Sequence, residues 1–303
     1  MAGVTSYISG METPASATRG FYPIESSSLR SLLKLEEPES FAVGTDSGTV
    51  GLWKAGRLAL PLDAHRRAVT ALATGGGLLA TGGLDRLIRV WELPEGVLRY
   101  ELREHRRGIC ALAFGLGGVH LVSVGLDGSC RVYAARSGEE LFYRTVPRRR
   151  LTLLLPLEQT ALSGGLSPEV TLWSFPGMEE IATVPTGAPC LYAGLVLSRH
   201  KLFLTVDYNQ NLILWSPSAR PVGSVGMRLN GRTTVACDTS EEAVAVCDGR
   251  WVEVYTLPDL ELTSRFRHRG RQARAIMVPE ADMVAVGDRR GVLSLYDVNR
   301  TLT

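Results

Sequence analysis

The chain has 303 residues, of which 45% are hydrophobic and 21% are charged, and its formal net charge at pH 7 is +2. This composition is close to the soluble average and supplies a sizeable core. No apolar run is long enough to span a membrane, and the start of the chain lacks the basic and apolar regions of a secretory signal. We therefore expect an intracellular protein, cytoplasmic or nuclear; a mitochondrial location stays open.

The first segment of the chain is small and polar, and we predict a flexible tail over residues 1–17 followed by a single domain over residues 18–303. Apolar runs then begin. Counting back from Trp53 by the offset seen in the second and third repeats, Arg19–Ile24 falls at the position of an outer strand. The first repeat is assigned only three inner strands, at Leu29–Leu35, Ser40–Gly44 and Thr49–Trp53.

A unit of about forty residues recurs along the rest of the chain. Each copy has two short apolar runs, a Gly/Asp turn, and a third run that ends in an aromatic residue. Successive terminal aromatics differ in number by 38, 42, 40, 42, 40 and 41. A constant period near forty with strands inside each unit predicts the blades of a propeller. The terminal aromatics are Trp53, Trp91, Tyr133, Trp173, Trp215, Tyr255 and Tyr296.

The second repeat shows the predicted strands most clearly, and the last repeat shows how the ring closes. The last repeat, about Gln272 to Asn299, ends after its third strand, so Arg19–Ile24 is predicted to supply the fourth. The inner strands are continuously apolar, as expected where stacked blades bury both faces of each sheet. In the second repeat the predicted strands are Val69–Ala73, Leu78–Gly82, Ile88–Trp91 and Val97–Leu102.

Over roughly residues 20–300, these seven copies at this spacing resemble the WD40-repeat family. The resemblance implies an all-β fold, a seven-bladed propeller of four-stranded antiparallel blades in which an N-terminal strand closes the last blade. WD40 blades often carry a structural tetrad of His, Ser/Thr, Asp and Trp, a buried polar network and not a hydrolase triad. Blades 6 and 7 are expected to lack it. The matching residues are His65, Thr81, Asp85 and Trp91 in blade 2, and His105, Ser123, Asp127 and Tyr133 in blade 3.

Charge is predicted to divide between the two faces of the ring. In WD40-like propellers the loops between blades share a face with the turns between the second and third strands. Acidic side chains gather in the other turns, including Glu95, Glu139, Glu179 and Glu241. We expect the basic face to bind a partner through the following arginines: Arg66, Arg67, Arg86, Arg106, Arg107, Arg148, Arg149, Arg150, Arg228, Arg232, Arg267, Arg269, Arg271, Arg289 and Arg290.

Other chemistry is absent from the sequence. The five cysteines form no CxxC pair, and four lie in apolar runs, which favours buried, reduced thiols and a reducing compartment. No His/Cys cluster has metal-ligand spacing, and no glycine-rich loop has phosphate-binding spacing. We therefore expect no metal, no cofactor and no small-molecule substrate, and the chain is not predicted to be an enzyme.

The sequence favours a scaffold or adaptor subunit of a multi-subunit intracellular assembly, with the arginine-rich face binding an acidic protein partner. The alternative is a nucleic-acid or ribonucleoprotein-associated propeller that binds RNA or another polyanion through the same face. Few aromatic residues interleave the arginines, which disfavours base stacking. A third possibility is a solvated arginine-rich surface without a dedicated ligand.

Overall fold

The structure is a computed structural model that describes residues 19–21, 27–37, 40–54, 57–145, 151–229, 233–270, 272–280 and 283–298. For residues 19–21, 57, 279 and 280 it describes the backbone only. The tail predicted over residues 1–17 lies outside the described residues.

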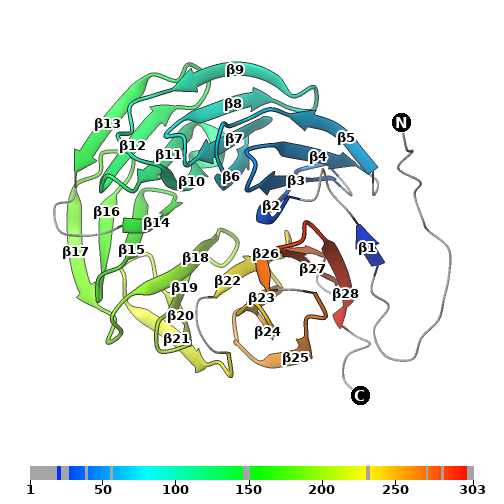
Figure 1. The fold of residues 1–303 in the computed structure, drawn as a ribbon. Helices are drawn as coiled ribbons and strands as arrows, with labels where there is room; N and C mark the ends of the chain where they lie inside the picture. The colour runs from blue at the N-terminus through cyan, green and yellow to red at the C-terminus, as the bar shows by residue number, and fades with distance from the viewer. Residues whose placement is uncertain are drawn as a thin grey trace.

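Seven four-stranded antiparallel sheets stand around a common centre (Figure 1). We call the strands of each blade a to d, from the centre outward. Blade 1 comprises β2 (Leu29–Lys34), β3 (Ser40–Thr45), β4 (Val50–Lys54) and β5 (Arg57–Leu62). Blade 2 comprises β6 (Val69–Gly75), β7 (Leu78–Gly83), β8 (Ile88–Glu92) and β9 (Val97–Leu102). Blade 3 comprises β10 (Ile109–Gly115), β11 (His120–Gly125), β12 (Ser129–Ala134) and β13 (Glu140–Thr145), with a 3-10 turn, η1 (Leu116–Gly118), after β10.

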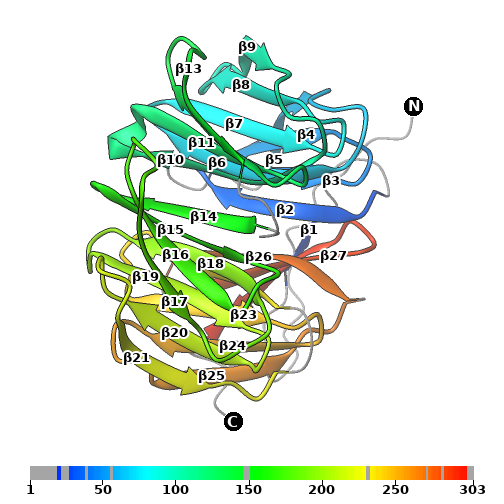
Figure 2. The ribbon, with the colours of Figure 1, turned by 90° about the vertical axis from the view of Figure 1, so that its left-hand side faces the viewer.

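The remaining blades repeat this plan, and the side view shows the sheets following one another around the ring (Figure 2). Blade 4 comprises β14 (Leu151–Leu157), β15 (Thr160–Gly165), β16 (Glu169–Ser174) and β17 (Glu180–Pro185). Blade 5 comprises β18 (Leu191–Leu197), β19 (Leu202–Asp207), β20 (Asn211–Trp215) and β21 (Pro221–Gly226). Blade 6 comprises β22 (Thr234–Cys237), β23 (Ala243–Cys247), β24 (Trp251–Thr256) and β25 (Leu262–Arg267). Blade 7 comprises β26 (Ala273–Glu280), β27 (Met283–Asp288), β28 (Leu293–Asp297) and β1 (Arg19–Phe21).

The seven-bladed architecture predicted from the repeat is confirmed, and so is its closure. β1 pairs antiparallel with β28, with Arg19 opposite Leu295 and Phe21 opposite Leu293. Of the predicted closing strand Arg19–Ile24, the structure describes Arg19–Phe21, and the other residues lie outside the described ranges. One blade therefore joins segments from opposite ends of the described chain.

The prediction of only three strands in the first blade is wrong. β5 adds an outer strand that pairs with β4, with Leu62 opposite Val50. This segment contains Pro61, which weakens its strand signal in the sequence. A proline is tolerated here because β5 lies at the outer edge of the sheet, where one side of the strand needs no ladder bonds.

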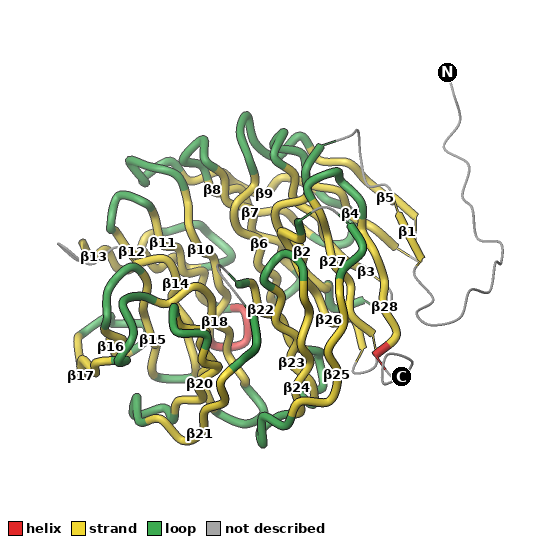
Figure 3. Tube along the Cα trace, turned by 60° about the horizontal axis from the view of Figure 1, so that its bottom comes forward, coloured by secondary structure: helices red, strands yellow, loops and turns green. Residues whose placement is uncertain are grey.

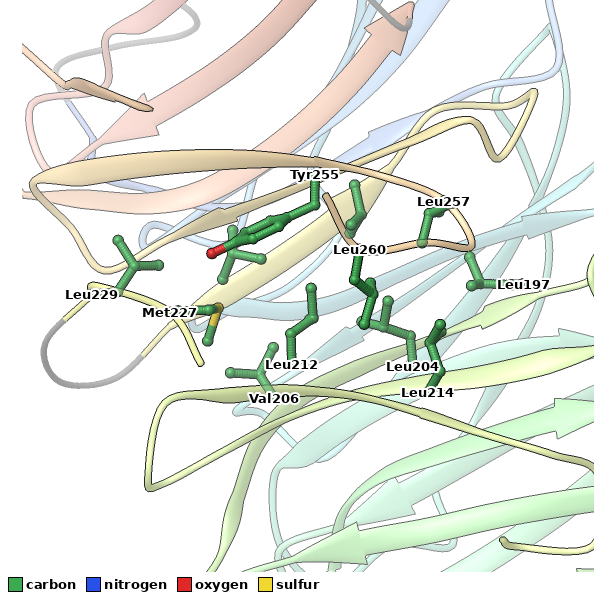
Figure 4. Close-up of a cluster of buried hydrophobic side chains, with 12 residues drawn as sticks. Leu197, Leu204, Val206, Leu212, Leu214, Met227, Leu229, Tyr255, Leu257 and Leu260 are labelled. Atoms are coloured by element: carbon green, nitrogen blue, oxygen red, sulfur yellow. The ribbon is translucent and has the colours of Figure 1, made fainter. Parts of the chain in front are cut away.

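The core lies between neighbouring blades. Every residue of β7 and of β23 is buried, which explains why the period-two alternation is absent from the second strands. At the boundary of blades 5 and 6, Leu204 and Leu214 lie in one buried cluster with Tyr255 (Figure 4). Burying side chains of this size contributes about 1.5–3 kcal/mol each, so apolar stacking dominates the stability of the ring.

The five cysteines are free thiols, but only two of them have the burial that the sequence predicted. Cys130 and Cys247 are buried, whereas the others are half-buried. Desolvation raises the pKa of Cys130 to about 12, and burial also raises the pKa of Cys247 to about 12. Both side chains therefore remain protonated at neutral pH and act as small apolar groups.

Removing β1 is expected to weaken the closing blade, because β28 then becomes an open edge. A chain that lacks residues 1–21 should lose about 2 kcal/mol of unfolding free energy, taking two ladder hydrogen bonds at about 1 kcal/mol each. Amide exchange in β28 should accelerate relative to β7. The matched control lacks residues 1–17 only and keeps β1. Equal melting temperatures and equal exchange in the two truncations would contradict a closing role for β1.

Candidate functional site

The loops of the ring separate into two sets, one at each end of the strands (Figure 3). The d-to-a loops lie beside the b-to-c turns, because Leu84 N donates to Ala68 O at 2.9 Å and Leu126 N to Gly108 O at 2.8 Å. The c-to-d turns lie beside the a-to-b turns, as in the 2.9 Å bond from Ala135 N to Val119 O. Each pairing recurs in other blades, so the two sets form opposite faces.

A buried polar network in blade 2 connects the core to the first of these faces. His65 Nε2 lies 2.9 Å from Thr81 Oγ1, and Trp91 Nε1 donates to the same hydroxyl at 3.2 Å. His65 Nδ1 lies 2.9 Å from Asp85 Oδ1. Asp85 Oδ2 accepts the backbone N–H of Arg66 at 3.1 Å. Burial lowers the pKa of His65 despite the neighbouring Asp85 carboxylate, so the imidazole is neutral at pH 7.

Blade 3 repeats the network with two changes of residue type, Ser123 for Thr81 and Tyr133 for Trp91. His105 Nε2 lies 2.7 Å from Ser123 Oγ, and its Nδ1 lies 3.3 Å from Asp127 Oδ2. Asp127 Oδ2 accepts the backbone N–H of Arg106 at 2.7 Å. Ser129 donates its hydroxyl to Asp127 Oδ1 at 2.6 Å. Tyr133 is fully buried in the third strand, at the position that Trp91 occupies in blade 2.

Blade 7 lacks the tetrad, as expected, but it contains a related network. His268 Nδ1 lies 2.7 Å from the hydroxyl of Tyr296, and that hydroxyl accepts the backbone N–H of Arg269 at 3.1 Å. Burial lowers the pKa of His268, while the charge of Asp288 opposes that shift. The spacing from His268 to Tyr296 equals that from His105 to Tyr133, so the sequence held a signal for it. Because Val286 occupies the Ser/Thr position, the tyrosine hydroxyl contacts the histidine directly.

Blade 6 uses a carboxylate where blades 2, 3 and 7 use histidine. Glu253 has a fully buried side chain that accepts the Tyr255 hydroxyl at 2.7 Å and Arg265 Nε at 2.9 Å. It also accepts the backbone N–H of Arg228 at 3.2 Å. The sequence signal for this network was a single acidic residue, Glu253, in an otherwise apolar strand. A charged group that is buried in such a strand requires a partner.

In four blades, therefore, a buried acceptor holds the backbone amide of a loop arginine: Arg66, Arg106, Arg228 and Arg269. The described arginines of the predicted basic face are all exposed, and we call the surface that they form the arginine face. Its members are Arg66, Arg67, Arg86, Arg106, Arg107, Arg228, Arg267, Arg269, Arg289 and Arg290. Five further predicted members, Arg148, Arg149, Arg150, Arg232 and Arg271, lie outside the described residues.

The loop arginines differ from the strand arginines in whether they form ion pairs. Arg89 forms an ion pair with Glu101, and Arg131 forms one with Glu140. Among the described residues, no carboxylate lies within ion-pair distance of the side chains of Arg66, Arg67, Arg86, Arg106, Arg107, Arg228, Arg267, Arg289 or Arg290. The guanidinium groups of these arginines thus have no ion pair to break before they bind an outside carboxylate, although Arg289 Nη1 donates to Gln272 Oε1 at 3.0 Å.

The comparisons with known proteins agree with this geometry. The family model described as WD domain, G-beta repeat, matches residues 56–92 and 96–134. The WD repeat-containing protein srw1 of Schizosaccharomyces pombe (strain 972 / ATCC 24843) is 25% identical over 228 residues, covering 72% of this chain and 40% of that protein. The chain is a WD40-repeat β-propeller.

Other relatives of this WD40 propeller are also matched over only part of their length. Coronin-7 of Pongo abelii is 31% identical over 116 residues, which is 34% of this chain and 12% of that protein. A p21-activated protein kinase-interacting protein 1-like protein of Xenopus laevis is 24% identical over 236 residues, covering 77% of this chain and 53% of that protein. The chain thus spans much less than the full length of these relatives.

A solved structure shares the complete fold of this WD40 propeller. The structure of U3-55K superposes with a TM-score of 0.81 at 16% sequence identity. The match covers 93% of this chain and 99% of that chain. At this level of identity the match bears on the fold alone.

The opposite face of the WD40 propeller carries exposed acids, including Glu95, Glu139 and Glu179. Glu241, predicted to belong to this surface, is buried instead. Its carboxylate accepts the backbone N–H groups of Ser198 at 2.7 Å and of Arg199 at 2.8 Å, and so ties blade 6 to blade 5. The prediction from turn position could not anticipate this contact between blades.

Neither a metal site nor a membrane-spanning helix is found within the described ranges of the WD40 propeller. No group of three or more His, Cys, Asp and Glu side chains there could hold a metal ion. No helix in those ranges is long and apolar enough to cross a membrane.

Removing the central hydroxyl of the blade 2 network should destabilise the WD40 propeller. In Thr81→Val, His65 Nε2 and Trp91 Nε1 both lose their partner, and we expect a loss of about 2–4 kcal/mol because each unpaired buried group costs about 1–3 kcal/mol. Thr81→Ser keeps the hydroxyl and is the control. Denaturant titration measures both unfolding free energies. A valine variant as stable as the serine variant would contradict the network.

The blade 3 network should give a distinct acid dependence. Desolvation acts to raise the pKa of Asp127, but hydrogen bonds from Ser129 and Arg106 outweigh it and lower this pKa from 3.8 to about 2. The carboxylate therefore stabilises the fold fully above the unfolded pKa, and this contribution disappears as pH falls towards 2.

Comparison of the wild-type chain with Asp127→Asn isolates this contribution. The difference in melting temperature should be constant above about pH 5 and should shrink between pH 4 and pH 2. Glu139→Gln, at an exposed turn position on the opposite face, is the control and should give no such difference. A difference for Asp127→Asn that is unchanged down to pH 2 would exclude the lowered pKa.

Proposed function

We propose that this WD40 propeller is a non-enzymatic adaptor of an intracellular multi-subunit assembly, and that its arginine face binds an acidic segment of a protein partner. The observation that carries the proposal is that the exposed guanidinium groups of Arg66, Arg106 and Arg228 have no ion-pair partner among the described residues, while the backbone N–H of each is held by a carboxylate. Arg66 and Arg106 are the clearest cases, because their backbone N–H groups donate hydrogen bonds to Asp85 at 3.1 Å and to Asp127 at 2.7 Å.

Anchored loops favour binding because less conformational entropy is lost when the partner docks. The arginine side chains remain free to form forked, two-bond contacts with carboxylates. Among the described residues, none forms an ion pair with Arg66, Arg67, Arg106 or Arg107 that would have to be broken first. Affinity would thus come from the loops, while the apolar ring keeps their spacing fixed.

The opposite charge of the two faces supports an adaptor role. An acidic partner is attracted to the arginine face and repelled by the face that carries Glu95, Glu139 and Glu179. A second protein can therefore occupy the other face at the same time. The free thiols are consistent with a reducing compartment.

The test is purification of the tagged full chain from cells that express it, with and without nuclease. Charge reversal at Arg66, Arg67, Arg106 and Arg107 to Glu should remove a fixed set of co-purifying proteins, and the wild-type set should survive nuclease. Substitution of Lys54, Arg199, Lys201 and Arg220 to Glu changes the net charge equally, outside the arginine face, and is the control.

The melting temperature of both variants should stay near that of the wild-type chain, because all eight side chains are exposed. Partners that persist on the arginine variant would refute the proposed surface. Partners that disappear with nuclease would assign the arginine face to nucleic acid.

A further inference from the structure

One sector of the arginine face carries no charged side chain. It comprises the b-to-c turn of blade 4 (Leu166–Pro168), the d-to-a loop before blade 5 (Pro185–Pro189), and the tyrosines Tyr192 and Tyr208. We call these residues the apolar sector. Leu166 is 50% exposed and Tyr208 is 52% exposed, although both are large apolar side chains. Isolated exposed leucines are common, so the argument depends on how the sector is built.

Hydrogen bonds join the three parts of the apolar sector into one surface. Thr186 donates its backbone N–H to Pro168 O at 2.8 Å and its hydroxyl to the same oxygen at 3.0 Å. Asn209 Nδ2 donates to Gly187 O at 3.2 Å on the other side of the loop. The loop before blade 5 therefore bridges the turns of two blades, and Leu166 and Tyr208 are held in fixed relative positions.

Tyr192 extends the sector to the inner rim of the ring. It is the second residue of β18, and the register with β19 shifts there, from Leu191–Asp207 to Ala193–Val206. A bulge of this kind redirects a side chain and is common at binding sites. The rings of Tyr192 and Tyr208 lie 5.8 Å apart.

The same bulge recurs at the second residue of the innermost strand in five other blades, so it is a regular feature of this rim. The bulge residues are Arg30, Thr70, Cys110, Thr152, Tyr192 and Arg274. Only in blade 5 is this residue aromatic.

We propose that the apolar sector receives a large apolar side chain from the same acidic polypeptide that the arginine face binds. This inference rests on the proposed function and specifies the partner: an extended acidic segment interrupted by a leucine or an aromatic residue. Charge complementarity supports it, since Arg106 and Arg107 precede blade 3 and Arg228 precedes blade 6, on either side of the sector. A chain that spans blades 3 to 6 meets guanidinium groups at both ends and apolar surface between them.

The shape of the sector favours a polypeptide over a nucleic acid. A base needs a flat face to stack on, but the two tyrosine rings lean on each other with an interplanar angle of 47°. Leu166, Pro168 and Pro189 offer aliphatic surface without hydrogen-bond donors. Such a surface gains free energy by burying an apolar side chain and gains little from a phosphate.

The experiment uses two fluorescent 12-residue peptides and the full chain. The first peptide contains only Glu and Ser, and the second carries Leu and Phe at its two central positions with the same number of Glu. Twelve extended residues span about 40 Å, enough to cross several blades. Fluorescence anisotropy should give a Kd about tenfold lower for the second peptide, the ratio expected when one large apolar side chain is buried.

The variant Leu166→Ser with Tyr208→Ser should bind both peptides with the affinity that the wild-type chain has for the first. Leu166→Ser alone provides a milder test and should lose part of the preference. The matched control is Leu116→Ser with Val119→Ser, which removes two exposed apolar side chains of the opposite face. It should keep the tenfold preference.

The outcomes separate this inference from the function on which it rests. If the wild-type chain binds both peptides equally, the apolar sector is refuted and the acidic-partner function stands. If it binds neither peptide, both are refuted. A 12-nucleotide uridine oligomer that binds more tightly than either peptide, with equal affinity for the wild-type chain and the sector variant, overturns the inference in favour of nucleic acid.

Discussion

The arrangement of the arginine face depends on one repeated interaction, the hydrogen bond from a loop arginine's backbone N–H to a buried acceptor. The acceptor is a carboxylate beside a histidine in blades 2 and 3, a glutamate in blade 6 and a tyrosine hydroxyl in blade 7. Each acceptor is itself fixed by partners in the core. The hydrogen bond thus fixes the loop backbone to the sheet, while the arginine side chain stays in solvent.

Blades 4 and 5 use a smaller version of the network. Trp173 donates to Ser163 and Trp215 to Thr205, each at 2.8 Å. In blade 5 the following turn is organised by Asp207, which accepts the backbone N–H of Asn211 at 2.7 Å and does not reach the preceding loop. That loop is instead held by its own backbone bonds to the neighbouring turns, and it carries no arginine. Among the described loops, the two kinds of anchoring therefore coincide with the charged and the uncharged parts of the face.

The fold could be predicted from the sequence because the forty-residue period and the apolar strands are local signals that seven copies reinforce. The networks of blades 2 and 3 followed from residue types at fixed spacing. Those of blades 6 and 7 did not, because Glu253 and Tyr296 fulfil by geometry a role that other residue types have elsewhere. Similarly, the sequence placed Glu241 on a surface by its turn position, whereas its burial arises from contact with the next blade. Contacts between blades join residues far apart in the sequence, and no periodic pattern in the sequence marks them.

The pairing of β1 with β28 also sets the order in which the ring can be completed. Arg19 is paired with Leu295, so β1 is synthesised long before its only ladder partner in the described chain exists. At about 5–20 residues per second, the intervening chain takes roughly a quarter of a minute to a minute to appear. During that interval the first six blades can stack, but the seventh cannot form. The nascent ring therefore presents two unfinished blade faces, and chaperones or assembly partners have a defined period in which to engage them.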